Sequence, residues 1–383
     1  MNKRGLYIAY EFNYKRDTTL SDSGVELSGI DKKIYNHIHS FEKQDIEMLF
    51  YNPYLKRCHR IERILRRLPF HFLHKWDFDY KTLDKLDFIY IRKQWFMDGD
   101  TILFLKKVKT YRPNIKIVLE IPTYPYDNEG KAVSMIPLKI KDKFWRKYLK
   151  RYIDRVITYS NDKEIFGIET IVVSNAIDYE SAKRESLYSV DNLNFPINMI
   201  ACASLYYWHG YDRAIEGLHN YYSSSKRNRE LNLYIVGEGR EKEKLERMVY
   251  EYHLEDHIKI TGGLYGRPLD DIYNKCLIGL DSMGRHRSGV FYNSSLKGKE
   301  YCAKGLIIVS GVETELDSAS DFPFYIRIPA DDSPVDFEEV VDKCNLLFGK
   351  YEIVDIQKSI MNYAKEHFDF ESTMKTVIEY LVS

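Results

Sequence analysis

The sequence predicts an α/β protein made of two Rossmann-like, doubly wound domains. Short β-rich runs alternate with helical periodicity along its 383 residues, which is typical of parallel sheets covered by helices on both faces. The alternation stops once, over a polar segment at 179–195 without a clear period, and then resumes. The length also fits two domains better than one. We therefore expect a first domain at 1–192 and a second domain at 193–364.

The first half begins with a strand at 5–10, followed by a helix in which apolar residues recur at helical spacing from Ile30 to Phe41. Gly29 lies where the loop meets this helix. It either lets the backbone approach a ligand or forms a plain N-terminal turn. Further strands are expected at 47–51, 87–92, 116–120, 156–160 and 170–173, and further helices at 101–111 and 139–155.

Charge is distributed unevenly along the chain. Residues 1–192 carry 35 Lys and Arg against 27 Asp and Glu, a net of +8, and the remainder carries 22 against 30, a net of −8. A helical pattern at 54–76 includes four arginines between 60 and 67. It is either a helix for an anionic bilayer surface or an ordinary helix with a solvated arginine face. No motif that reads nucleic acid is present, so we expect a membrane surface and no nucleic acid as partner.

Other simple signals bear on compartment and metals. No apolar stretch approaches the ~20 residues that span a bilayer, and no signal peptide follows Met1. The five cysteines form no CxxC pair, and His253 and His257, four residues apart, have no third ligand nearby. We expect a cytoplasmic protein, peripheral at the inner face of the cell membrane, without a metal site.

The second half repeats the β-α alternation. Gly237 and Gly239 follow the strand expected at 231–236 and resemble half of a dinucleotide fingerprint. The third glycine and a ribose-binding acidic residue are missing, which argues against NAD but leaves a nucleotide phosphate or ribose. Other strands are expected at 198–204, 258–261, 277–283, 306–309 and 325–328, and helices at 211–222, 241–252, 269–276, 336–348 and 353–381.

Residues 284–305, GRHRSGVFYNSSLKGKEYCAKG, carry the strongest local signal for a ligand. A basic loop and a short helix stand between two strands, where ligands bind in open α/β sheets. The helix N-terminus and four cations (Arg285, Arg287, Lys297 and Lys299) favour a phosphate or diphosphate, with Glu300 as a hydroxyl acceptor. The alternative is a solvated basic loop.

A second loop with a possible role in binding is 121–127, IPTYPYD, at the end of a buried strand. Two prolines restrict its backbone, and its hydroxyls emerge where substrate-contacting loops lie. Pro122, Thr123 and Tyr124 are therefore candidates for contact with a substrate, or else form a rigid structural turn.

Several motifs, in order, resemble those of the large retaining glycosyltransferase family called family 4, which has the GT-B fold. SNAID at 174–178 resembles the family's NGID segment, and WHGYD at 208–212 resembles KG-x-D. VGEG at 236–239 resembles VGxG, and SLKGKEYCAKG at 295–305 resembles a form found in capsule and exopolysaccharide transferases. The resemblance covers nearly the whole chain and implies that a C-terminal helix at 365–383 returns to the first domain.

The chain departs from the family at several positions. The first glutamate of the family's E-x7-E pair falls at Tyr292, and the second matches Glu300. The usual Arg and Lys near the start of the second domain fall at Ser204 and His209. The histidine expected within 121–124 is absent.

The resemblance implies transfer of a sugar from a UDP- or GDP-sugar, with retention and without a metal or other cofactor. Lys297 and Arg213 would bind the diphosphate, Arg287 and His209 would assist, and Glu300 would bind the ribose. The remaining donor-side residues would be Gly210, Gly237, Gly239, Gly263 and Leu296, and the acceptor-side residues Gly29, Pro122, Thr123, Tyr124 and His286.

The acceptor is expected to be a glycan or a polyprenyl-diphosphate-linked glycan in surface polysaccharide synthesis. Each residue also has an ordinary structural explanation; Arg213, for example, could pair with Glu216 one turn along a helix. A different function stays open as well, that of a non-catalytic GT-B partner which stabilises an active transferase. Loss of the first glutamate and of the two usual basic residues would be expected in such a non-catalytic partner.

Overall fold

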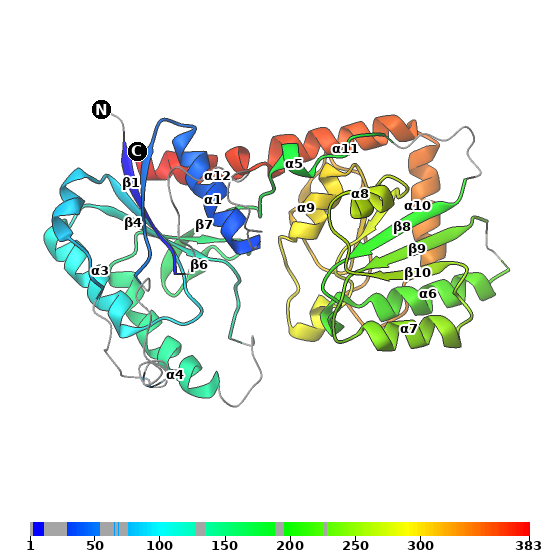
Figure 1. Ribbon diagram of the computed structural model, residues 1–383, viewed down its shortest axis with the longest axis horizontal. Helices are drawn as coiled ribbons and strands as arrows, with labels where there is room; N and C mark the ends of the chain where they lie inside the picture. The colour runs from blue at the N-terminus through cyan, green and yellow to red at the C-terminus, as the bar shows by residue number, and fades with distance from the viewer. Residues whose placement is uncertain are drawn as a thin grey trace. The chain divides into compact units, whose positions relative to one another are not determined.

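A computed structural model describes residues 3–10, 29–53, 65, 68, 76–127, 135–187, 195–225 and 228–383 (Figure 1). The arginine-rich segment expected to be a membrane helix, at 54–76, lies almost wholly outside the described residues. The chain divides into two compact units, Met1–Val173 with Thr373–Ser383, and Ser174–Ser372. The sequence had placed this division at 192 and the returning segment at 365. Each unit holds one predominantly parallel α/β sheet, which confirms the predicted fold class.

The sheet of the first unit has the order β2-β1-β3-β4-β5-β7-β6. All of its pairings are parallel except the one between β6 and β7, a short hairpin that the sequence did not predict. Its strands are β1 (Arg4–Ile8), β2 (Glu47–Tyr51), β3 (Phe88–Arg92), β4 (Lys116–Ile121), β5 (Arg155–Thr158), β6 (Glu164–Ile165) and β7 (Ile168–Val172). The strand order reverses between β1 and β3, so these two strands form the switch point at which ligands bind in such sheets.

Helices cover both faces of this sheet (Figure 1). Along β3, Phe88 and Tyr90 pack in one apolar cluster with helix α1 (Gly29–Glu42), while Ile89 and Ile91 pack in the other with α3 (Gly99–Tyr111). Successive residues of a strand point to opposite faces, so an unbroken apolar run fills two cores. The other helical segments of this unit are η1 (Tyr80–Lys85), α4 (Ile136–Trp145) and η3 (Arg146–Arg151).

The end of the chain belongs to the first unit. The sequence predicted one helical region at 353–381, but the helix breaks at Asp369 into α11 (Ile353–Phe368) and α12 (Phe370–Val382). Met374, Val377, Ile378 and Leu381 of α12 pack in the same cluster as α1. The Lys116 ammonium of β4 donates to the Tyr380 carbonyl at 2.8 Å. Buried apolar contacts and this hydrogen bond hold the returning helix in place.

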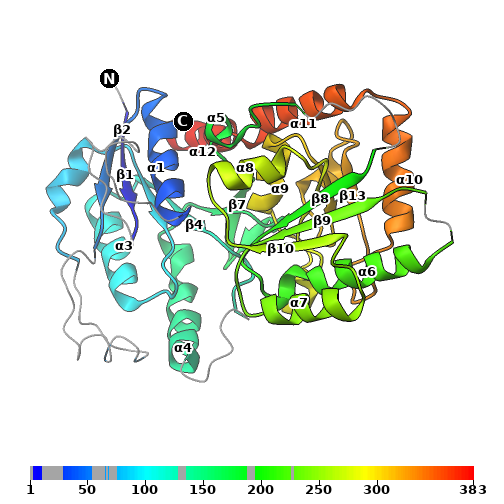
Figure 2. The ribbon, with the colours of Figure 1, turned by 45° about the vertical axis from the view of Figure 1, so that its right-hand side comes forward.

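The sheet of the second unit is wholly parallel, in the order β10-β9-β8-β11-β12-β13. Its strands are β8 (Ile197–Cys202), β9 (Leu231–Val236), β10 (Ile258–Gly262), β11 (Ile278–Leu280), β12 (Ile307–Ser310) and β13 (Tyr325–Arg327). Its longer helices are α6 (Tyr211–Ser223), α7 (Lys242–Glu251), α8 (Arg267–Tyr273), α9 (Leu296–Ala303), α10 (Phe337–Phe348) and α11. Figures 1 and 2 show α6 and α7 on one face and α8, α9 and α11 on the other. The switch point lies between β8 and β11.

Short helical turns complete the second unit: α5 (Tyr179–Ala182), η4 (Tyr207–His209), η5 (Arg285–Ser288) and η6 (Glu315–Ser318). The residues of the histidine pair do not share a helical face, because α7 ends at Glu251 and His253 adopts a left-handed φ of 54°. His257 stacks on Tyr222 at 3.8 Å instead. Within the described residues, no helix is long and apolar enough to cross a bilayer.

Candidate functional site

Residues from three segments meet at the switch point of the second unit. His209 and Gly210 follow β8 through the turn η4, Asp281 and Ser282 follow β11 directly, and Lys297 lies in the first turn of α9. The carboxyl ends of β8 and β11 are neighbours in the sheet, so the side chains that follow them come together. The two sequence candidates Lys297 and His209 are thus brought to one place.

Lys297 is the centre of this group. Its Nζ donates to His209 Nδ1 at 3.0 Å and to Ser282 Oγ at 3.1 Å. The Tyr211 hydroxyl lies 3.4 Å away and a carboxylate oxygen of Asp281 3.5 Å away. The ammonium is therefore held by neutral oxygen and nitrogen acceptors, with one buried carboxylate as its counter-ion.

The electrostatics assign the charges within this group. Burial lowers the pKa of Lys297, partly offset by Asp281, and nearby Arg285 lowers it further. Burial, with the charges of Lys297 and Arg285, lowers the pKa of His209 to about 2. His209 is therefore neutral at physiological pH and accepts from the lysine. Lys297 and Arg285 supply the positive charge here.

The N-terminus of α9 is attached to the same group. Ser295 caps the helix by accepting from the Gly298 N–H at 3.4 Å, and its hydroxyl donates to Asp281 at 2.8 Å. Asp281 is almost fully buried, so this contact ties the start of the helix to the end of β11. Leu296 is exposed, and Glu300 is exposed one turn beyond Lys297 on the same side of the helix.

Gly210 allows the two turns η4 and η5 to approach each other. Its φ is 65°, and a Cβ there would lie 2.6 Å from the backbone nitrogen of Gly284. A larger residue would separate the turns and move His209, whose carbonyl accepts from the Met283 N–H at 2.8 Å. Gly210 thus acts on the site through backbone packing.

Gly237 and Gly239 have a packing role that the sequence did not reveal. A Cβ at Gly237 would lie 1.8 Å from the Ala203 carbonyl oxygen, and one at Gly239 would lie 2.3 Å from that of Leu205. These glycines let the chain after β9 lie against the chain after β8. At Gly263 the nearest atom to an added Cβ is 3.7 Å away, so packing alone does not require glycine there.

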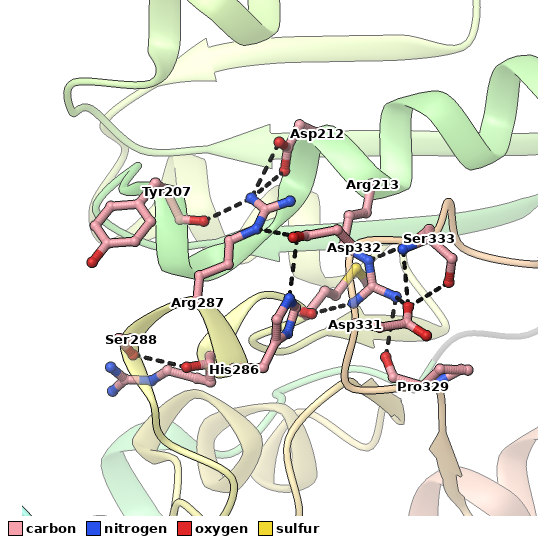
Figure 3. Close-up of polar contacts among 12 residues, drawn as sticks. Tyr207, Asp212, Arg213, His286, Arg287, Ser288, Pro329, Asp331, Asp332 and Ser333 are labelled. Carbon is pink, nitrogen blue, oxygen red and sulfur yellow. Dashed lines mark hydrogen bonds and ion pairs between the residues drawn. The ribbon is translucent and has the colours of Figure 1, made fainter.

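Arg213 differs from its expected role at the diphosphate. Its side chain is only 1% exposed, and its guanidinium donates to the carbonyls of Met283, Ser333 and Pro329 (Figure 3). Asp331 lies at 3.5 Å. The guanidinium therefore joins α6 to the loops after β11 and β13, and has no exposed face to offer a phosphate. Nor does Arg213 pair with Glu216, the structural alternative considered from the sequence.

Arg287 and His286 are also engaged within the second unit (Figure 3). Arg287 binds both carboxylate oxygens of Asp212, at 2.9 and 3.1 Å, and Asp332 at 2.6 Å. His286 Nε2 lies 3.1 Å from the same Asp332 oxygen. The acceptor-side role expected for His286 and the diphosphate role expected for Arg287 would both require these contacts to break.

The other two cations of the 284–305 stretch have different surroundings. Lys299 is buried, forms an ion pair with Glu315 and lies 4.4 Å from the Phe368 ring centre, so it stabilises the packing of α9. Arg285 is partly exposed and lies close enough to lower the pKa of Lys297. Tyr292, where the resemblance implies the family's first glutamate, is half-buried, and burial together with Glu315 and Glu313 raises its pKa.

The first unit has its own pocket, a cavity of about 240 Å³. It lies at the β1/β3 switch point, because Ala9 and Tyr10 follow β1, Arg92 ends β3 and residues 93–96 follow it. Pro122 and Thr123, two of the residues expected to contact a substrate, are among the residues that line it. Gly29 is the first residue of α1, which also lines the pocket through Ile30 and Ile34. Tyr124 packs against Phe166, with ring centres 5.9 Å apart.

Some site residues were not among the sequence candidates. Asp281 and Ser282 stand within the run LIGLDSM, and their position directly after a buried strand is the sequence signal for them. Arg92 is the last residue of the strand β3, and Trp95 lies in the loop that follows it. Among the residues that the structure describes, no group of three or more His, Cys, Asp or Glu is arranged to hold a metal ion.

Comparisons with known proteins agree with this architecture. Residues 196–280 match the pattern of the family described as glycosyl transferases group 1. No curated protein sequence matches the chain significantly. Among solved structures, HepE of Anabaena in complex with UDP is 12% identical over 100% of both chains, with a TM-score of 0.59.

Two further structures are similar to the same extent. The lipopolysaccharide outer core galactosyltransferase WaaB is 15% identical over 98% of this chain and 99% of its own, with a TM-score of 0.61. A glycosyltransferase of Rickettsia africae is 12% identical over 99% of this chain and 98% of its own, with a TM-score of 0.59. The chain therefore has the GT-B fold of these structures, and residues 196–280 of its second unit carry the pattern of the group 1 glycosyl transferases.

Proposed function

We propose that the chain is a retaining glycosyltransferase of family 4 that transfers a sugar from a nucleotide-sugar donor to a glycan acceptor. The observation that carries the proposal is the Lys297 ammonium at the β8/β11 switch point, 3.0 Å from the neutral His209 imidazole. It lies in the first turn of α9, so the cation and the helix N-terminus favour an anion at the same place. The family pattern within the same unit supports a diphosphate as that anion.

The geometry suggests how the residues share the work. Lys297, with Arg285 beside it, stabilises the diphosphate as it leaves the anomeric carbon, which is fixed-charge stabilisation of the transition state. Glu300, exposed one turn along α9, accepts hydrogen bonds from the ribose hydroxyls. In a retaining reaction, the leaving phosphate oxygen can take the acceptor's proton. The proposal includes neither a metal nor another cofactor.

The donor is proposed to be a UDP-sugar, because the similar HepE structure is a complex with UDP. Isothermal titration with UDP, GDP and ADP tests this proposal. Hydrolysis assays with UDP-sugars follow if UDP binds. Binding of UDP with tighter affinity than GDP or ADP is expected. A folded protein that binds none of the three would contradict the proposed function.

The acceptor is proposed to be linked to a lipid at the inner face of the cell membrane, in surface polysaccharide synthesis. Support comes from the segment formed by α4 and η3, which carries seven Lys and Arg against one Asp. Ile136 and Ile140, one helical turn apart, are each about half exposed on it. Exposed apolar residues among lysines are typical of a helix that lies on an anionic bilayer.

Vesicle sedimentation tests this membrane contact. Lysines near an anionic surface contribute ~1 kcal/mol each, so the double variant Lys143→Glu/Lys147→Glu should bind phosphatidylserine vesicles at least tenfold more weakly. The matched control is Lys343→Glu/Lys350→Glu, which makes the same charge change in the second unit. Equal loss in both variants would show general electrostatic attraction and no specific surface.

A non-catalytic partner protein with the GT-B fold is the second candidate. The observations that favour it are the tyrosine at position 292 and the engagement of Arg213 and Arg287 by other groups. The two candidates differ in one measurement. Hydrolysis or transfer of a UDP-sugar that is lost in Lys297→Ala and Glu300→Ala identifies an enzyme, and a folded chain that binds no nucleotide favours the partner.

A further inference from the structure

The pocket of the first unit has an unusual charge balance. Its lining combines apolar side chains from α1, β4 and the loop after β3 with two charged residues, Arg92 and Lys93. Both are cations, and no acidic residue is among the described residues that line the pocket. The volume of about 240 Å³ is below the ~300–1,000 Å³ of pockets that enclose drug-sized ligands. The pocket therefore fits a group of the size of a single sugar ring.

Arg92 is held in place from behind by Glu120. This carboxylate is fully buried, forms an ion pair with the Arg92 guanidinium, and accepts from the hydroxyls of Tyr90 at 3.0 Å and Tyr159 at 2.9 Å. Burial alone would raise the pKa of Glu120, but Arg92, His37 and Lys33 hold it at about 2, so the anchor stays charged. The guanidinium uses one nitrogen for Glu120, and Arg92 is one of the residues that line the pocket.

Unlike Arg92, Lys93 uses its ammonium group for contacts within the pocket wall. Its Nζ donates to the carbonyls of Gln94 at 3.0 Å and Trp95 at 3.1 Å, and lies 3.3 Å from buried Asp142 of α4. Asp142 also accepts from the Met97 N–H at 2.7 Å and the Tyr126 hydroxyl at 2.8 Å. The wall is therefore preorganised, and Arg92 is the cation that can meet a ligand.

The mouth of the pocket offers a surface for stacking. The Trp95 side chain is 71% exposed although it is large and apolar, and Phe96 and Tyr126 line the pocket with it. An exposed indole beside a pocket marks a place where a ligand covers it. Gln94 and Thr123 add an amide and a hydroxyl, which suit the hydroxyl groups of a sugar.

We propose that this pocket binds a sugar ring that carries a carboxylate or phosphate group, with Arg92 pairing with the anion and Trp95 covering the ring. A planar guanidinium pairs with either group through two parallel hydrogen bonds. The inference deepens the proposed function and rests on it, since it makes the acceptor an anionic glycan. The binding site itself belongs to the first unit alone.

Ligand-observed NMR titrations with three soluble probes test the proposal: methyl glucuronide, glucose 1-phosphate and methyl glucoside. At least one anionic probe should bind about tenfold more tightly than the neutral glucoside, the gain of a charge-assisted hydrogen bond. Whichever anionic probe is preferred identifies the group as a carboxylate or a phosphate. Equal affinity for all three probes overturns the proposal.

Two variants test whether Arg92 and Trp95 are responsible for binding of the probes. In Arg92→Gln the preference for the anionic probe should disappear, and in the control Arg155→Gln, which removes an arginine paired with exposed Glu169 in the same unit, it should persist. Loss of Arg92 leaves Glu120 buried without its main partner, so Trp95→Ala at an exposed position provides the second test. It should weaken all three probes several-fold while the melting temperature stays the same. Wild-type affinity in Trp95→Ala, or a retained preference in folded Arg92→Gln, overturns the proposal.

UDP titration of the same samples separates this inference from the proposed function. A protein that prefers the anionic probe but does not bind UDP keeps the pocket assignment and loses the donor assignment. A protein that binds UDP but shows no preference among the three probes keeps the donor assignment and loses the pocket assignment.

Discussion

Removal of the Lys297 charge tests the donor site most directly. A hydrogen bond from a charged group is worth ~1.5–3 kcal/mol. Asp281 at 3.5 Å already neutralises part of the ammonium, so we take the lower end, ~1.5–2 kcal/mol. Lys297→Gln should therefore weaken UDP binding about 10- to 30-fold. Lys297→Arg, which keeps the charge, should retain most of the affinity.

The assay is isothermal titration with UDP, on protein whose folding is confirmed by its melting temperature. Lys304→Ala is the matched control, because Lys304 follows the same helix and pairs with Asp270 at 2.7 Å. Its UDP affinity should stay within about twofold of the wild type, because its ion pair with Asp270 does not involve the group around Lys297. UDP affinity in folded Lys297→Gln within twofold of the wild type would refute the assignment.

A second mechanism could produce the same loss. Without Lys297, buried Asp281 keeps an uncompensated negative charge that repels the diphosphate. The double variant Asp281→Asn/Lys297→Gln removes this repulsion while the cation stays absent. Affinity that stays low in the double variant supports direct contact with Lys297. Recovery to the wild-type value would show that the lysine acts only by masking Asp281.

Further predictions concern pH, charge and packing. In the proposed function the ammonium form of Lys297 is the one that binds the diphosphate. UDP affinity should then be full below the lowered pKa of Lys297 and fall as pH rises through that value, while the affinity of Lys297→Arg, measured in parallel, stays constant. Arg285→Gln should weaken UDP binding less than Lys297→Gln, about three- to tenfold, since Arg285 is partly exposed. Arg213→Met should lower the free energy of unfolding by ~2–4 kcal/mol in a denaturant titration, because three carbonyls lose their donor. Gly237→Ala should lower the melting temperature markedly, because its Cβ would lie 1.8 Å from the Ala203 oxygen.

The layers of the fold follow from local sequence. The run at 88–91 is apolar at every position, and strands buried on both faces require this, so the strand β3 and the helices on its two faces could be predicted from the sequence. The hairpin β6–β7 is not, because β6 has only two residues and its pairing depends on neighbours in space. The helix break at Asp369 could not be predicted from hydrophobic periodicity either, because apolar residues continue on both sides of it.

The candidate site was predictable in part for the same reason. Lys297 and Glu300 are three residues apart after a strand and loop, so their common side of one helix follows from spacing. Arg213 is different, because its acceptors are carbonyls of residues 283, 329 and 333, at least 70 positions along the chain. Every residue has a backbone carbonyl, so the sequence does not indicate which carbonyls an arginine will contact. Only the folded chain shows that Arg213 has a structural role.

The same reasoning sorts the cations around α9. From the sequence, Lys297 and Arg213 are expected at the diphosphate with Arg287 assisting, and Lys299 is a further cation of the same stretch. Arg213, Arg287 and Lys299 are bound by carbonyls or carboxylates within the second unit. Lys297 instead faces the neutral imidazole of His209, at the position where the resemblance to family 4 implies a lysine. A lysine there would place a second ammonium beside the first, whereas neutral His209 accepts from Lys297 and orients it. The replacement thus leaves one positioned cation, with Arg285 near it, in place of several. Loss of Lys297 should therefore be poorly compensated, which makes its substitution a sharp test of the donor site.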